Sequence, residues 1–180
     1  MKRTRRLTMA AILVSVMLVL GYLESLLPVS SVPGIKLGLS NCVLLISLYW
    51  LGVWLSFEMM LVKVVLLGLL MGNPMMIVYS LAGGTLSLTL MSILSGRKGV
   101  SAIGAGIAGG VAHNVGQIAV AMLILQTPSL VYYLGVLMPV GAGMGFLTGT
   151  VARTLMRVLP PPVRLQNKQE HEPQMEENAP

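Results

Sequence analysis

The side chains of this chain that could do chemistry are few, and three stand close together. His113, Asn114 and Gln117 lie in the run VAHNVGQ (111–117), and residues four apart, such as His113 and Gln117, share one face of a helix. Imidazole and amide groups both donate and accept hydrogen bonds, which suits the edge of a heterocyclic or polar ligand. A hydrogen-bond network that only fixes helix packing would use the same residues, and both interpretations stay open.

Lys63 is a second candidate because it falls in the middle of an apolar run. A charged group at the centre of a bilayer costs about 2.5–3.5 kcal/mol on insertion scales. The nearest acidic residue, Glu58, is five positions away, which places it about 140° around a helix. We therefore expect Lys63 to find its partner on another helix or on a ligand.

The segment 28–38 (PVSSVPGIKLG) is the longest break between apolar runs. Its prolines and glycines favour a semi-rigid loop, which we interpret as a lid. The loop holds Lys36 and leads into Asn41, and Glu24 precedes it. A surface pair of Glu24 with Lys36 and a role of both in ligand capture remain alternatives. Tyr79 begins a stretch rich in small and hydroxyl residues, which permits either a cavity or close helix packing. The candidate binding residues are Lys36, Asn41, Lys63, Tyr79, His113, Asn114 and Gln117.

Composition excludes several kinds of site. All six acidic residues are Glu, so Asp-rich magnesium sites and Ser-His-Asp triads are absent. Cys42 is the only cysteine, which rules out an internal disulfide or a multi-Cys metal site. The chain has no GxxxxGK[ST] loop for ATP. We expect no enzyme activity and no resident cofactor or metal, and a transporter of this kind would need outside energy.

The elements that must position these residues are apolar helices. The 180-residue chain is 55% hydrophobic and 10% charged, outside the balance of soluble proteins. At roughly 20 residues per span, the sequence predicts an all-α membrane protein with six transmembrane helices in one compact bundle. Breaks rich in Gly and Pro place the spans near 7–27, 39–52, 54–72, 74–95, 100–126 and 128–157. The second span is short for a hydrocarbon core of about 30 Å, so we expect neighbouring helices to support it.

Basic residues predict the orientation, because Lys and Arg collect on the cytoplasmic side of a membrane. They occur in the N-terminal segment 1–6, in the turn at 97–98 and at Arg153 and Arg157. With six spans between residues 7 and 157, both termini are then cytoplasmic. The polar tail 158–180 is expected to be disordered. Basic residues that flank apolar runs fit membrane ends better than a nucleic-acid groove, so no nucleic-acid partner is expected.

Glycines in the last two spans are spaced for close helix contact. Gly141, Gly145 and Gly149 recur every four residues, as do Gly106 and Gly110. Such spacing lets two membrane helices approach closely. Whether these helices pack inside one bundle or between subunits is open at this stage.

Four motifs carry a resemblance to a known family. They are YLESLLP (22–28), PGIKLGLSN (33–41), YSLAGGTLSL (79–88) and VAHNVGQ (111–117). Over about residues 7–157 the chain resembles the Gx transporter or heptaprenyl diphosphate synthase component I family. That family is similar to the S-components of energy-coupling factor (ECF) transporters, six-helix vitamin binders driven by a transmembrane coupling protein and two ATPases. The resemblance implies a substrate-binding subunit in the bacterial cytoplasmic membrane.

The resemblance also implies partners. In S-components, small residues at four-residue spacing on the first helix contact the coupling protein, and Ala11 and Ser15 match that spacing. Membrane lipids surround such a bundle, and its ligand would be flavin, thiamine-like or isoprenoid-related. Relatives also resemble a membrane component of flavin-based extracellular electron transfer. The alternative function is therefore an assembly or anchor partner in electron transfer or a quinone or isoprenoid pathway, without transport.

Overall fold

A computed structural model of the chain describes residues 2–26, 38–97 and 99–159. These residues form six α-helices and one short 3-10 helix. In chain order they are α1 (Lys2–Leu26), α2 (Leu39–Leu51), α3 (Val53–Leu70), α4 (Pro74–Ser95), α5 (Ala102–Leu125), η1 (Pro128–Tyr133) and α6 (Leu134–Val158). Five segments, namely α1, α3, α4, α5 and η1 with α6, are long and apolar enough to cross a membrane. The prediction of an all-α membrane protein with six helices is confirmed.

Helix boundaries agree with the predicted spans except at two places. The first helix begins at Lys2 rather than near residue 7, because Lys and Arg are good helix formers and continue the helix beyond its apolar part. The sixth span begins as a 3-10 turn at Pro128 before α6 starts. The predicted disordered tail and the predicted lid lie mostly outside the described residues.

The short helix α2 lies at the centre of the bundle. It contacts each of the other five α-helices, and ten of its thirteen residues are buried. A helix of this length spans only about 20 Å, less than the thickness of the hydrocarbon core. Because protein rather than lipid covers α2, its length need not match the bilayer. Neighbouring helices therefore support the second span, as predicted.

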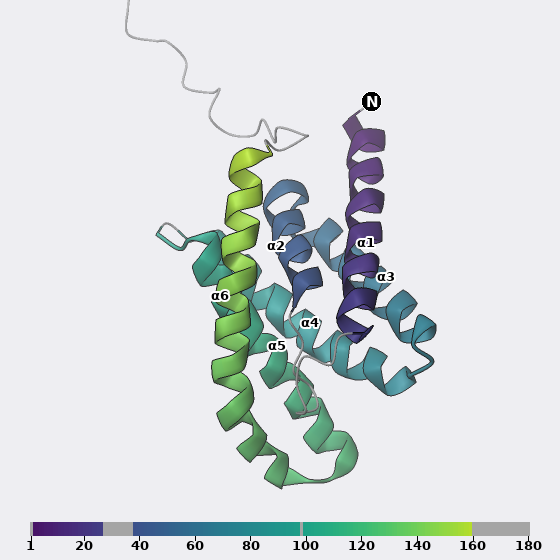
Figure 1. Ribbon diagram of the computed structural model, residues 1–180, viewed down its shortest axis with the longest axis vertical. Coiled ribbons are helices and arrows are strands. Elements are labelled where there is room, and N and C mark those ends of the chain that lie inside the picture. The colour runs from purple at the N-terminus through teal and green to yellow at the C-terminus, as the bar shows by residue number, and fades with distance from the viewer. Residues whose placement is uncertain (1, 27–37, 98, 160–180) are drawn as a thin grey trace, which may run out of the picture.

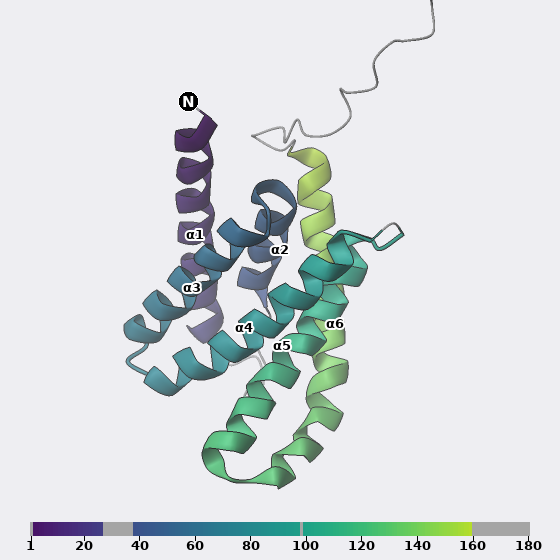
Figure 2. The ribbon, with the colours of Figure 1, turned by 180° about the vertical axis from the view of Figure 1, so that it is seen from behind.

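The other helices follow one another around α2 in the order α1, α3, α4, α5, α6. Figures 1 and 2 show α1, α2 and α6 on one side of the molecule and α3, α4 and α5 on the other. This arrangement brings every helix beside the interior of the bundle, where side chains from all six can meet.

Charged side chains of α1 hold both ends of α2. The Arg6 guanidinium donates a hydrogen bond of 2.6 Å from Nη2 to the carbonyl oxygen of Leu51, the last residue of α2. At the other end, the Glu24 carboxylate accepts a hydrogen bond from the backbone N–H of Leu39, the first residue of α2. A cation at the C-terminus of a helix and an anion at its N-terminus both oppose the helix dipole. The first helix thus fixes the position of the central one.

The connections between helices set the register of the buried residues. Gly52 alone separates α2 from α3 and has a φ of 90°, a backbone conformation that favours glycine. The Asn73 side chain accepts a hydrogen bond of 3.2 Å from the N–H of Met76 and caps α4. Such a cap satisfies one of the unpaired N–H groups at a helix start. It thereby fixes where α4 begins.

The glycines of α5 and α6 form one close contact inside the bundle. A Cβ atom added to Gly110 would lie 2.2 Å from the carbonyl oxygen of Gly141, and one added to Gly106 would lie 2.6 Å from that of Gly145. The two backbones can come this close only because neither side carries a side chain. The glycine spacing therefore serves packing within one chain, which answers the question left open by the sequence.

All the basic helix ends lie toward one end of the bundle. The described start of α1 and the described end of α6 are both at the top of Figures 1 and 2. The turn between α4 and α5, which contains Arg97, is also directed toward that end. The last two turns of α6 carry Arg153 and Arg157. The clustering that the orientation prediction requires is thus present.

Candidate functional site: a polar cavity among six helices

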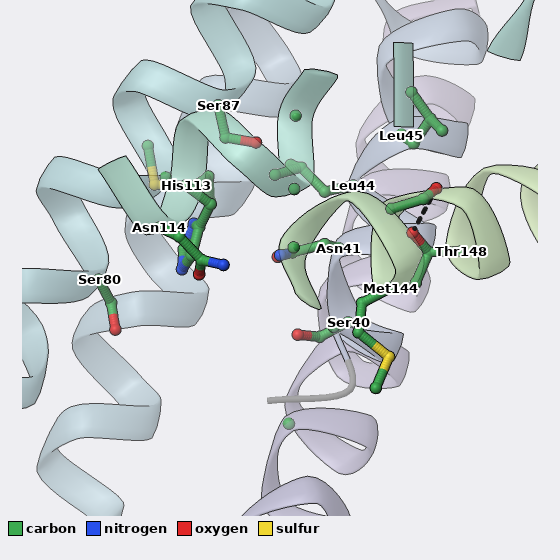
Figure 3. Close-up of a pocket in the computed structure, with 18 of the residues that line it drawn as sticks. Ser40, Asn41, Leu44, Leu45, Ser80, Ser87, His113, Asn114, Met144 and Thr148 are labelled. Carbon is green, nitrogen blue, oxygen red and sulfur yellow. Dashed lines mark hydrogen bonds between the residues drawn. The ribbon is translucent and has the colours of Figure 1, made fainter. Parts of the chain in front are cut away.

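A cavity with a volume of about 190 Å³ lies inside the bundle, and all six α-helices line it. An engineered cavity of about 150 Å³ is large enough to bind benzene, whereas sites for drug-sized ligands run from about 300 to 1,000 Å³. As the described residues define it, the cavity holds a molecule of roughly one substituted ring. Figure 3 shows Asn41 of α2 and His113 and Asn114 of α5 pointing into the same space.

Lys63 and Asn41 meet on one wall of the cavity. The Lys63 side chain is only 9% exposed, and its Nζ atom donates a hydrogen bond of 3.3 Å to Oδ1 of Asn41. Lys63 belongs to α3 and Asn41 to α2, so the expected partner on another helix is found. The amide oxygen stabilises the buried ammonium group, and both side chains line the cavity.

His113 and Gln117 lie on the face of α5 that packs against α4. A Cβ atom at Gly83 of α4 would lie 2.7 Å from the carbonyl oxygen of His113 and 2.8 Å from Cγ of Gln117. The expectation that His113 and Gln117 share one helix face is therefore confirmed. Both side chains also line the cavity, so glycine at 83 lets α5 bring an imidazole and an amide to this wall.

Asn114 serves packing as well as the cavity. Its Nδ2 atom donates a hydrogen bond of 2.7 Å to the carbonyl oxygen of Leu137 in α6. Leu137 lies two residues before Pro139, which is inside α6 and has no N–H to donate to the carbonyl oxygen of Gly135. The Asn114 amide thus holds α6 beside α5 at its proline. Of the two interpretations of the VAHNVGQ cluster, the packing network accounts for this hydrogen bond.

Glu24 reaches the cavity from the C-terminal end of α1. Its carboxylate lines the cavity and accepts the N–H of Leu39 at the start of α2. Lys36, the predicted partner of Glu24 and a predicted ligand contact, lies outside the described residues. The described lining contains one ammonium group, that of Lys63, and one carboxylate, that of Glu24. The formal charges of these two side chains balance.

The structure does not bring Tyr79 to this cavity. Successive residues of a helix point about 100° apart, and the neighbouring Ser80 is the one that lines the cavity. Ala11 and Ser15, the predicted partner contacts, are also outside the lining. Both are exposed on α1, and the Ser15 hydroxyl donates to the carbonyl oxygen of Ala11 at 3.0 Å. They lie on a surface that faces away from the protein interior.

Sequence reasoning missed most of the cavity wall. Four methionines and five hydroxyl residues of the lining were not among the candidate binding residues; they are Met60, Met76, Met91 and Met144, and Ser25, Ser40, Ser80, Ser87 and Thr148. The chain's 14 methionines were a usable signal, because methionine adapts its shape to irregular spaces and is common at binding surfaces. Their positions alone do not tell which of them face inward.

Comparison with known proteins gives the same family as the four sequence motifs. The sequence profile of the family described as heptaprenyl diphosphate synthase component I matches residues 13–155. Comparison with curated proteins and with solved structures gives no match. The matched region runs from the middle of α1 to the last turn of α6 and includes every described residue that lines the cavity. The chain therefore belongs to the heptaprenyl diphosphate synthase component I family.

Proposed function

We propose that the chain is the substrate-binding membrane subunit of an ECF-type transporter for a small vitamin-like or precursor molecule. The observation that carries the proposal is the polar cavity to which all six α-helices contribute. Protein interiors are close-packed, with few voids larger than a water molecule. A bundle with a purely structural task has no need of a cavity of about 190 Å³ lined by Lys63, His113 and Gln117.

The arrangement of charges supports an orientation for this subunit. The basic helix ends lie toward one end of the bundle, which we assign to the cytoplasm of a bacterial cell by the positive-inside rule. The cavity is lined by the C-terminal end of α1, at Gly21 and Glu24, and by the N-terminal half of α2, from Ser40 to Leu45. These parts lie away from the basic end, so the ligand would enter from outside.

The energy for transport would come from other chains. The sequence has no GxxxxGK[ST] loop, the element that binds ATP phosphates in P-loop proteins. We place the contact with a transmembrane coupling protein at Ala11 and Ser15, which are small and exposed on α1. Small residues allow a partner helix to approach closely in a membrane.

The cavity argues against the reaction named in the family's description. A heptaprenyl chain of seven isoprene units far exceeds a cavity of about 190 Å³. A diphosphate carries several negative charges, whereas the described lining offers the Lys63 ammonium and the opposing Glu24 carboxylate. The chain also has no Asp to hold magnesium. These features favour a binding role without catalysis.

Co-purification tests the proposal. Tagged protein isolated gently from its native membrane should bring with it a coupling protein and two ATPases. Ser15→Trp should lose them, because a large side chain blocks close approach. Val16→Trp is the matched control, since Val16 is also exposed and points about 100° away on the same helix. A redox protein in place of the ATPases would contradict the proposal and favour the electron-transfer alternative.

A further inference from the structure

The walls of the cavity are rich in thioether groups. Met60 of α3 is 1% exposed and Met91 of α4 is 3% exposed, and Met76 and Met144 also line the cavity. Among the described lining residues there is no Phe, Tyr or Trp. Methionine sulfur makes favourable contacts with aromatic rings. The methionines therefore offer sulfur contacts to an aromatic ligand in the cavity.

Two glycines make room for these methionines. A Cβ atom at Gly84 would lie 2.9 Å from Sδ of Met60, and one at Gly109 would lie 2.7 Å from Sδ of Met91. Each sulfur thus occupies the place of a missing side chain on a neighbouring helix. This keeps the two thioethers in the wall and preserves the volume of the cavity.

The polar groups of the lining suit the edge of a heterocycle without net charge. Asn41, His113 and Gln117 supply amide and imidazole groups, which can both donate and accept hydrogen bonds. Among the described lining residues the charges of Lys63 and Glu24 oppose each other, so this part of the lining has no excess charge to match a ligand with a large net charge. A ring with nitrogen or amide groups at its edge can hydrogen-bond to these polar side chains, and its apolar faces can contact the methionines.

We infer that the ligand of this cavity is a neutral aromatic heterocycle with a single ring. The inference rests on the proposed function and narrows the substrate class. A cavity of about 150 Å³ binds benzene, so the 190 Å³ that the described residues define accepts one ring with a small substituent. The three fused rings of a flavin exceed it.

Binding of four probes to the full chain in lipid nanodiscs tests this inference. Nicotinamide has one neutral aromatic ring with an amide; cyclohexanecarboxamide has a saturated ring, nicotinate has a negative charge, and lumichrome has three fused rings. Nicotinamide should bind at least about tenfold more tightly than the saturated or the charged probe. Lumichrome should not bind. Equal affinity for the aromatic and saturated amides, preference for lumichrome, or no binding of nicotinamide would overturn the inference.

Exchange of methionine for leucine separates the thioether effect from shape. Met60→Leu and Met91→Leu roughly conserve volume and should weaken nicotinamide binding by about two- to tenfold, with cyclohexanecarboxamide unchanged. Met75→Leu is the control, since Met75 is 50% exposed and outside the cavity lining. Unchanged nicotinamide affinity in both cavity variants would refute the role of the thioethers. Co-purification of the ATPases is scored separately, so the ligand class can fail while the proposed transporter role stands.

Discussion

A single added methyl group at Gly110 tests how closely α5 and α6 must pack. In Gly110→Ala the new Cβ atom would lie 2.2 Å from the carbonyl oxygen of Gly141, whereas ordinary contact begins at 3.4 Å, so the backbones must separate by about 1.2 Å. Overpacking costs typically about 1–3 kcal/mol, and a rigid backbone neighbour points to the upper end of that range. Alanine recovers about 1 kcal/mol of helix propensity. We expect the free energy of unfolding to fall by about 2 kcal/mol.

Gly143→Ala is the matched control for this prediction. Gly143 lies on α6, two residues from Gly141, and an added Cβ atom would meet nothing within 4 Å. Helix propensity alone should then leave the stability unchanged or raise it by up to about 1 kcal/mol. The assay is reversible unfolding of the purified protein in bicelles with increasing SDS, followed by tryptophan fluorescence. Equal effects of the two substitutions would refute the close contact of α5 with α6.

Three further substitutions test residues of the cavity wall. Asn114→Ala removes the hydrogen bond to Leu137 and should lower the free energy of unfolding by about 0.6–1.7 kcal/mol; no loss would contradict its packing role. Lys63→Met should lower the melting temperature, because it leaves the Asn41 amide oxygen without its buried donor, and should abolish ligand binding; a variant that binds the ligand normally would show that Lys63 is not part of the site. Gly84→Ala should push the flexible end of Met60 into the cavity and weaken binding with little change in melting temperature, and unchanged affinity would count against the mapped cavity.

The helices could be predicted from the sequence because each break carries a local signal. Gly52, Asn73 with Pro74, and Pro128 stand where helices begin or end. The central place of α2 could be inferred only in part. The short length of α2 indicated that neighbouring helices must support it. Helices of a membrane protein are apolar on all sides, however, so the hydrophobic pattern of α2 does not tell which helices those are. The contacts of Arg6 and Glu24 with the two ends of α2 join residues far apart in the sequence and leave no local trace.

The candidate site could be predicted where polarity was unusual for a membrane helix. Lys63, His113 and Gln117 stood out for that reason, and the structure brings them to one cavity. Tyr79 was predicted to contact the ligand, but the neighbouring Ser80 lines the cavity instead, because successive residues of a helix point about 100° apart. Methionines such as Met60 are apolar like the rest of the helix. Only the three-dimensional structure separates those that line the cavity from those that face outward.

The most direct test of the binding role is mass spectrometry of small molecules retained by the protein after gentle purification from its native membrane. The double variant His113→Ala/Gln117→Ala removes two polar groups of the cavity wall. Tyr79→Phe is the matched control, because Tyr79 does not line the cavity. We predict one small aromatic heterocycle in the unchanged protein and in Tyr79→Phe, and its loss from the double variant that still elutes as a folded protein. Lipids alone, in equal amounts in all three proteins, would contradict the claim that this cavity binds a substrate.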